Sequence, residues 1–216
     1  MSWTLPAVNM SYSDSGFHLE IPEFIIEDDG FLAVVGRNGS GKSTYARTLA
    51  RLSNGEWFYL PQYPEDFLFA ENLLRQIEDL LMVVPERQRL LGIMTSLGFD
   101  RPEDLLELPF HILSGGELRR IALACAFYLE PRQLILDEPT IGLTGKENLA
   151  ILDYLNTFLS MKHRLIIVTH DLEFIRAGGS VMALKDGSLG YTGRIDPFLA
   201  GESPVARDYG VRFHGQ

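Results

Sequence analysis

The sequence predicts an α/β fold with a mostly parallel core sheet, a small antiparallel β edge and an inserted α-helical lobe. Short apolar runs at residues 31–35, 134–136 and 165–168 are each followed by polar or glycine-rich residues. Such runs are typical of strands buried on both faces of a parallel sheet. Between the first two runs, leucines and other apolar residues recur at helical spacing, which predicts the inserted lobe.

The remaining elements follow in chain order. Residues 3–10 and 17–21 are predicted to form the antiparallel edge, and residues 57–60 a further strand. Residues 180–185 and 188–192 are separated by Asp186-Gly187, which indicates a hairpin. We therefore expect one domain over residues 1–216. Its α/β core comprises residues 1–65 and 113–195, its helical lobe residues 66–112, and its loosely held tail residues 196–216.

Composition limits the function. The formal net charge of the 216 residues is −10, and no run of Lys and Arg is present, so nucleic acid is a disfavoured partner. The single cysteine, Cys125, allows no internal disulfide, which fits a reducing compartment. The first ten residues do not resemble a signal peptide. The apolar runs are too short to cross a bilayer, so a function at a membrane would need another, spanning subunit.

The loop after the first core strand matches the phosphate-binding motif G-x-x-x-x-G-K-[ST] in full. Glycines let such a loop turn its backbone N–H groups toward an anion, and the N-terminus of the next helix adds its dipole. The Lys42 ammonium is expected to reach the β- and γ-phosphates of ATP, and the Ser43 hydroxyl to ligate Mg²⁺. The predicted nucleotide-binding residues here are Gly36, Asn38, Gly39, Ser40, Gly41, Lys42, Ser43 and Thr44.

Two acidic residues follow the second core strand. In a parallel sheet Asp137 would lie beside the phosphate-binding loop, where its carboxylate can hold Mg²⁺, usually through water. Glu138 is one residue farther out, toward the position of an attacking water. We therefore predict Glu138 as the general base or water-orienting group.

Three further segments resemble the motifs of ABC ATPases. Leu113-Ser114-Gly115-Gly116-Glu117 resembles the family's signature sequence LSGGQ. Gln62, after the strand at 57–60, is similar to the Q-loop glutamine, and His170 is similar to the switch histidine. The order of the motifs also agrees with the family, and the resemblance extends to about Thr192.

The resemblance implies a site completed by two subunits. Ser114, Gly115 and Gly116 open a helix and would receive the ATP held by the opposite subunit. Gln62 would contact Mg²⁺ or the attacking water, and His170 would donate to the γ-phosphate. Together with Lys42 and Glu138, these two residues are the expected catalytic set. The expected metal ligands are Ser43, Gln62 and Asp137. Tyr12 would stack on adenine, or pack in the core or at the surface.

A narrower similarity points to a transport role. Residues 61–71 and 119–124 are similar to the corresponding segments of energy-coupling-factor and cobalt-type importer ATPases, which drive uptake of vitamins or transition-metal ions. The expected function is therefore an ATP-hydrolysing subunit, peripheral on the cytoplasmic face of the membrane. Its expected partners are an integral membrane subunit and a second ATPase subunit, in a homodimer or a heterodimer. Phe67, Leu68 and Phe69 would form an apolar surface for the membrane subunit, or pack inside the lobe.

The sequence also departs from the family pattern. The segment 43–61 is about half as long as is usual, so the antiparallel edge must be trimmed there. Thr144 ends a loop that normally ends in Asp, and Glu117 replaces the Gln of the signature. Two other functions stay open at this point. One is a soluble ABC ATPase acting on nucleic acid or the ribosome, and the other is a nucleotide switch with weak hydrolysis.

Overall fold

The computed structural model describes residues 2–11, 16–27, 30–177, 179–200 and 204–211. They divide into two compact units, which we describe separately. The first unit comprises residues 1–59, 132–138 and 162–216, and the second comprises residues 60–131 and 139–161. The chain thus passes from the first unit to the second directly after Glu138 and just before Gln62. The single-domain boundaries expected from the sequence stay a prediction.

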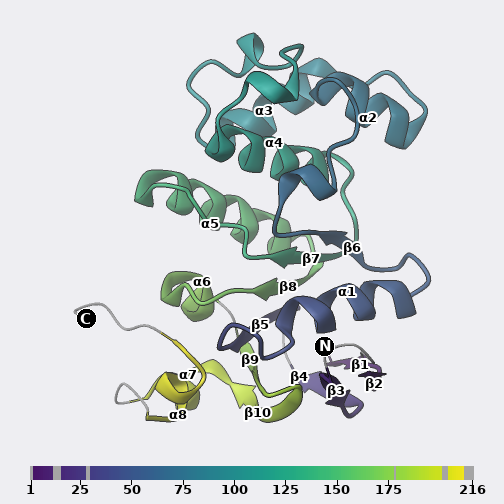
Figure 1. Cartoon of the computed structure of the whole chain (residues 1–216). Coiled ribbons are helices and arrows are strands. Elements are labelled where there is room, and N and C mark those ends of the chain that lie inside the picture. Colours follow the sequence, from purple (N-terminus) through teal and green to yellow (C-terminus); the bar gives the residue numbers. More distant parts are fainter. Residues whose placement is uncertain (1, 12–15, 28–29, 178, 201–203, 212–216) are drawn as a thin grey trace. The chain divides into compact units, whose positions relative to one another are not determined.

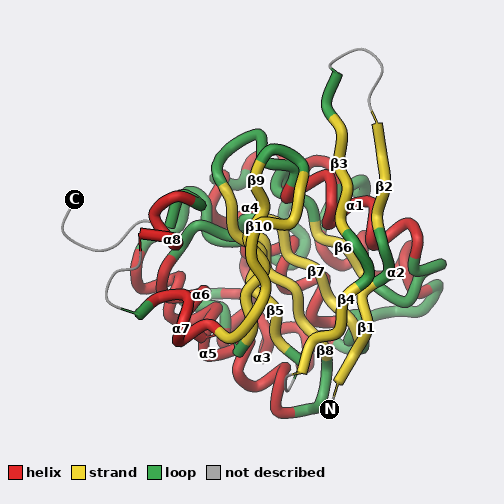
Figure 2. Tube along the Cα trace, turned by 90° about the horizontal axis from the view of Figure 1, so that it is seen from below, coloured by secondary structure: helices red, strands yellow, loops and turns green. Residues whose placement is uncertain are grey.

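The main sheet has eight strands in the order β2-β3-β10-β9-β5-β8-β7-β6, and β1 and β4 form a separate antiparallel pair (Figure 2). Neighbours β9, β5, β8 and β7 are parallel, which confirms the mostly parallel core. The strands are β1 (Ser2–Leu5), β2 (Val8–Ser11), β3 (His18–Ile21), β4 (Phe24–Glu27), β5 (Phe31–Gly36), β6 (Phe58–Leu60), β7 (Gln133–Asp137), β8 (Arg164–Val168), β9 (Ser180–Lys185) and β10 (Ser188–Arg194).

Figure 1 labels the helices. Those of the first unit are α1 (Lys42–Leu52), α6 (Leu172–Ala177), α7 (Ile195–Leu199) and α8 (Pro204–Asp208). Those of the second unit are α2 (Leu73–Leu81), α3 (Arg87–Ser96), α4 (Gly115–Tyr128) and α5 (Gly145–Ser160), with single 3₁₀ turns at Pro64–Asp66, Pro102–Asp104 and Phe110–Ile112. Within the described residues, no helix combines the length and the apolar character that crossing a membrane requires.

The carboxyl ends of β5 and β7 carry the two motifs predicted from the sequence. All six residues of β5 are buried, as are the last four of β7, because helices and neighbouring strands cover the central strands. Gly36 ends β5 and Asp137 ends β7. Since parallel strands present their carboxyl ends at one edge, the fold delivers both motifs to the same side of the sheet.

Two details differ from expectation. Residues 3–10 form two strands, because Pro6 lacks an N–H and interrupts the pairing; β1 then pairs with β4, and β2 with β3. The tail is not loosely held throughout. The side chains of Phe198, Ala206 and Val211 are buried in a cluster that also includes Ile175 and Val181. The short turns of this tail lack the periodicity by which a sequence reveals a packed helix.

The second unit packs α2 and α3 against α4. The central helix α4 is buried from Arg120 to Tyr128, and Cys125 lies within that stretch. Burial raises the pKa of the Cys125 thiol to about 12, so this cysteine is an unreactive core residue. Phe127 of α4 stacks on Tyr154 of α5, with ring centroids 4.4 Å apart, which ties α5 to the same core.

Candidate functional site

The phosphate-binding loop joins β5 to α1, and its glycines have the backbone conformation that the motif requires. Gly39 and Gly41 have φ angles of 82° and 101°, in the left-handed region that side chains with a Cβ rarely adopt. A Cβ on Gly41 would approach the Phe17 ring to 2.9 Å, so that position is closed to larger residues. The Gly187 N–H donates to the Ser40 carbonyl at 3.1 Å, which attaches the loop to the β9–β10 turn.

Lys42 folds back over the loop. Its Nζ donates to the Gly36 carbonyl at 2.8 Å and to the Arg37 carbonyl at 3.3 Å. Burial lowers the pKa of Lys42, and the nearby carboxylates of Glu138 and Asp137 partly oppose that shift. A buried ammonium bonded mainly to carbonyls gains a stronger partner when a triphosphate enters the loop, so the geometry fits ATP.

Asp137 receives two hydrogen bonds at the end of β7. The Ser43 hydroxyl donates to its Oδ1 at 3.1 Å and the Tyr59 hydroxyl to its Oδ2 at 2.9 Å. Burial raises the pKa of Asp137, and these two donors partly lower it again. A hydroxyl and a carboxylate in contact are the hard oxygen donors that Mg²⁺ prefers. In the described ranges, no cluster of three acidic, His or Cys side chains that could hold a metal occurs.

Glu138 and His170 form a pair beside this carboxylate. The His170 Nδ1 lies 3.1 Å from the Glu138 carboxylate, and the Glu138 side chain is only 9% exposed. Burial raises the pKa of Glu138, and the hydrogen bond and charge of His170 oppose that shift. Glu138 has a φ of 49°, a backbone conformation that costs a non-glycine residue about 1–2 kcal/mol. Strain of this kind is found where a side chain must take a fixed direction.

The first unit therefore brings Lys42, Ser43, Asp137, Glu138 and His170 together. The other loop residues differ in exposure: Asn38 and Gly39 are exposed, Ser40 is buried and Thr44 is half-buried in the first turn of α1. Their contacts with a nucleotide stay a prediction. The proposed adenine-stacking residue, Tyr12, is outside the described residues.

The second unit holds the remaining candidates. The Ser114 turn opens α4, and Ser114 and Gly115 are exposed. A Cβ added at Gly115 would meet nothing within 4 Å, so the space beside this turn is open. Gln62 is half-buried, and its carbonyl accepts a hydrogen bond from the Arg119 Nη1 of α4 at 2.8 Å. The Q-loop is thus attached to the helix that presents the Ser114 turn.

Tyr59 is a site residue that sequence reasoning missed. Tyr59 is 78 positions from Asp137 in the sequence, and no local motif predicts their contact. Burial and the Asp137 carboxylate raise the pKa of Tyr59, so its hydroxyl stays a donor at physiological pH. The sequence feature that could have identified Tyr59 is its position on the strand that leads to Gln62.

We expect Tyr59→Phe to weaken the use of Mg²⁺. Loss of the hydrogen bond leaves Asp137 oriented by Ser43 alone, and removal of such an outer partner typically lowers metal affinity about 10- to 100-fold. Titrating Mg²⁺ in an ATP-binding assay and in an ATPase assay measures the change. ATP binding without Mg²⁺ serves as the internal control and should be unaffected. Equal Mg²⁺ dependence in the two proteins would contradict a role for Tyr59.

The profile of the ABC transporter family matches residues 19–141, which is more than half of the chain. The chain belongs to the ABC transporter family. It is an ATPase subunit of that family, as the signature and the phosphate-binding loop indicated.

Individual relatives agree with this assignment. The chain is 30% identical to the energy-coupling factor transporter ATP-binding protein EcfA2 of Thermotoga maritima, over 86% of this chain and 79% of that protein. It is 31% identical to the zinc import ATP-binding protein ZnuC of Buchnera aphidicola, over 81% and 76% of the two chains. The solved structure of CbiO1 of Clostridium perfringens, part of an ABC transporter complex, superposes with a TM-score of 0.69 and 26% identity, over 92% and 90%.

Proposed function

We propose that the chain is the ATP-hydrolysing subunit of a membrane importer of the vitamin or metal-ion type, and that hydrolysis requires closure with a second ATPase subunit. The names of relatives support the importer type, since the similar proteins include a zinc import protein and energy-coupling-factor subunits. The observation that supports closure is the exposed Ser114 turn at the N-terminus of α4, where a phosphate could approach from outside the molecule.

Each functional residue of the first unit has its own role in the proposed reaction. Lys42 and the backbone N–H groups of its loop bind the phosphates, and Ser43 and Asp137 hold Mg²⁺. When bound, Mg²⁺ neutralises negative charge on the phosphates. Glu138 orients the attacking water and accepts its proton, and His170 fixes the direction of the Glu138 carboxylate and donates toward the γ-phosphate.

Gln62, Ser114, Gly115 and Gly116 complete the proposed site. Gln62 reports the nucleotide state to α4 through Arg119. In the closed pair, the Ser114 turn of one subunit contacts the ATP that is bound to the phosphate-binding loop of the other. ATP then holds the two subunits together. The ATP site on each subunit is incomplete without the other, which explains why a free subunit would hydrolyse slowly.

An apolar surface in the second unit fits a membrane subunit. Phe69 is 65% exposed and Phe67 and Leu68 are half-buried, so the three residues do not all pack inside the lobe. The buried Gln76 fixes the loop that presents them: its Oε1 accepts from the Phe69 and Ala70 N–H groups at 3.0 Å each. A rigid loop with an exposed aromatic side chain is a typical anchor in protein interfaces. We place the chain on the cytoplasmic face of the membrane, bound to an integral subunit.

We expect Phe69→Asp to release the chain from membranes of its native host. When an aromatic residue that becomes buried in an interface is replaced by a charged one, the binding affinity typically falls about ten-fold or more. The fraction of tagged protein that floats with membranes on a density gradient measures the effect. Ile25→Asp is the matched control, because Ile25 is similarly exposed, at 62%, but lies in the first unit. A wild-type chain that never associates with membranes would refute the transport role.

A further inference from the structure

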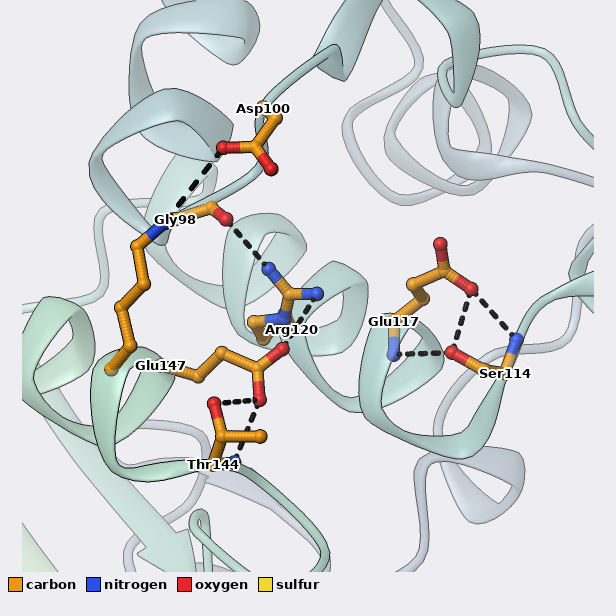
Figure 3. A network of polar contacts seen from close by, with 8 residues as sticks. Gly98, Asp100, Ser114, Glu117, Arg120, Thr144 and Glu147 are labelled. Atoms are coloured by element: carbon orange, nitrogen blue, oxygen red, sulfur yellow. Dashed lines mark hydrogen bonds and ion pairs between the residues drawn. The ribbon is translucent and has the colours of Figure 1, made fainter.

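Two helices of the second unit begin with the same arrangement of side chains (Figure 3). At the start of α4, the Glu117 Oε2 accepts hydrogen bonds from the Ser114 N–H at 2.9 Å and from the Ser114 hydroxyl at 2.6 Å. At the start of α5, the Glu147 Oε2 accepts from the Thr144 N–H at 2.7 Å and from the Thr144 hydroxyl at 2.9 Å. In both turns a carboxylate three residues into the helix holds the residue that caps it.

The two turns are neighbours in space. A Cβ added at Gly116, in the first turn of α4, would lie 3.5 Å from the Leu143 side chain and 3.7 Å from the Gly142 carbonyl. The Ser114 turn therefore lies beside the loop that leads to Thr144. Ser114, Gly142 and Thr144 are all exposed, so this pair of turns forms one accessible face of the unit.

Arg120 links the two turns from below the surface. Its Nη2 lies 2.9 Å from the Glu147 Oε1, and its Nη1 donates to the Gly98 carbonyl at 3.0 Å. The guanidinium also lies 4.1 Å from the centroid of the Phe99 ring. The Arg120 side chain is 9% exposed and that of Glu147 21% exposed, so water screens their attraction little. One planar group thus joins α4, the start of α5 and the end of α3, as Figure 3 shows.

We propose that Arg120 and Glu147 are positioning residues, which set the Ser114 turn against the Thr144 turn so that the pair can receive ATP held by a second subunit. The inference rests on the proposed function. The two oxygens of Glu147 act on different elements, because Oε2 holds the Thr144 turn and Oε1 holds Arg120 of α4. Loss of the negative charge releases α5 from α4 while the Thr144 turn can still be capped by a neutral side chain.

The arrangement separates positioning from nucleotide binding. Arg120 and Glu147 belong to the second unit, whereas the phosphate-binding loop belongs to the first. Their substitution should leave the binding of ATP to a single subunit unchanged and should weaken ATP-dependent closure. A general loss of folding would instead lower both the ATP binding of the single subunit and the ATP-dependent closure.

Glu147→Gln is the principal test variant, and Arg120→Lys keeps the charge but loses the planar fork. Both are made in the Glu138→Gln protein, which is expected to accumulate as the closed dimer. We expect each to raise the ATP concentration for half-maximal dimerisation, measured by analytical ultracentrifugation, roughly ten-fold. With Glu138 intact, the variants should lower kcat by a similar factor. ATP affinity of the single subunit, measured at a protein concentration too low for dimers, should stay the same.

Asp100→Asn is the matched control. Asp100 lies 4.0 Å from Lys146 and so pairs the segment after α3 with the start of α5, but its side chain is 92% exposed. An exposed pair of this kind contributes little, so dimerisation should be unaffected. The double variant Arg120→Lys/Glu147→Gln should be no worse than the more affected single variant, because the two residues act as one pair.

Each outcome decides the inference. It is overturned if Glu147→Gln dimerises and turns over like its parent, or if the variant loses single-subunit ATP binding to the same extent as dimerisation. If Arg120→Lys proves unfolded by thermal melting, Glu147→Gln decides alone. Failure of the Glu138→Gln parent to form any ATP-dependent dimer would instead refute the proposed function, and this inference with it.

Discussion

Glu138→Gln is expected to lower the turnover of ATP by about 10²- to 10⁴-fold, the usual contribution of a positioned general base. The Gln side chain has the shape of Glu and can still meet His170, but it cannot accept a proton from water. ATP binding should be preserved, because Lys42 and the phosphate-binding loop are untouched. The variant should therefore accumulate as an ATP-bound dimer.

Phosphate release and size-exclusion chromatography with and without ATP measure these two effects. Glu130→Gln is a suitable control, because Glu130 also has a left-handed backbone, with a φ of 47°, but its carboxylate pairs with Arg89 at the surface. The control should retain wild-type turnover. If Glu138→Gln also retained it, another group would have to be the base, and the pairing with His170 would lack a catalytic meaning.

Lys42→Ala is expected to lower the affinity for ATP at least about 100-fold, since a charge-assisted contact to the phosphates is lost from a site sheltered from water. The protein should remain folded. In the free subunit the buried ammonium is bonded to the Gly36 and Arg37 carbonyls, and its burial alone is unfavourable. Isothermal titration with ATP measures the affinity, and thermal melting without ATP measures the stability.

Arg51→Ala provides the comparison for that experiment. Arg51 is a cation at the other end of α1 and is exposed, so its removal changes the net charge equally without touching the loop. ATP affinity should be close to that of the wild type. Comparable losses in the two variants would mean that general charge, and no specific contact of Lys42, attracts the nucleotide.

The parts of the fold that the sequence predicted are those encoded locally. The strand, loop and helix around Lys42 follow from adjacent residues, and so does the hairpin at Asp186-Gly187. The family resemblance then supplied Gln62, Ser114 and His170. The structure places His170 against Glu138, and Gln62 in one unit with Ser114.

What the sequence could not predict depends on contacts between distant residues. Tyr59 meets Asp137 only because β6 joins the edge of the sheet next to β7. The link from Arg120 to Glu147 requires the packing of α4, α3 and the start of α5. The buried amide of Gln76 lies between Arg75 and Ile77 in the sequence and belongs to no motif. Such polar contacts are specified by tertiary packing and carry no local periodicity.

Thr144 shows why a single departure from the family pattern is hard to interpret from sequence. It ends a loop that normally ends in Asp in the family. In the structure a carboxylate is still present at this turn, because Glu147 reaches back to the Thr144 N–H and hydroxyl. Glu117 similarly holds the Ser114 hydroxyl at 2.6 Å, a contact that a bound phosphate would have to replace.

Mixing two inactive variants tests the central claim most directly. Lys42→Ala removes the phosphate-binding contact of one copy, and Ser114→Arg blocks the signature turn of another. Each alone should be inactive. Their mixture should recover about a quarter of the wild-type turnover, since half of the randomly formed symmetric dimers would carry one intact site out of two. A mixture that stays inactive, or a Ser114→Arg protein that hydrolyses ATP normally by itself, would contradict a site shared between two copies.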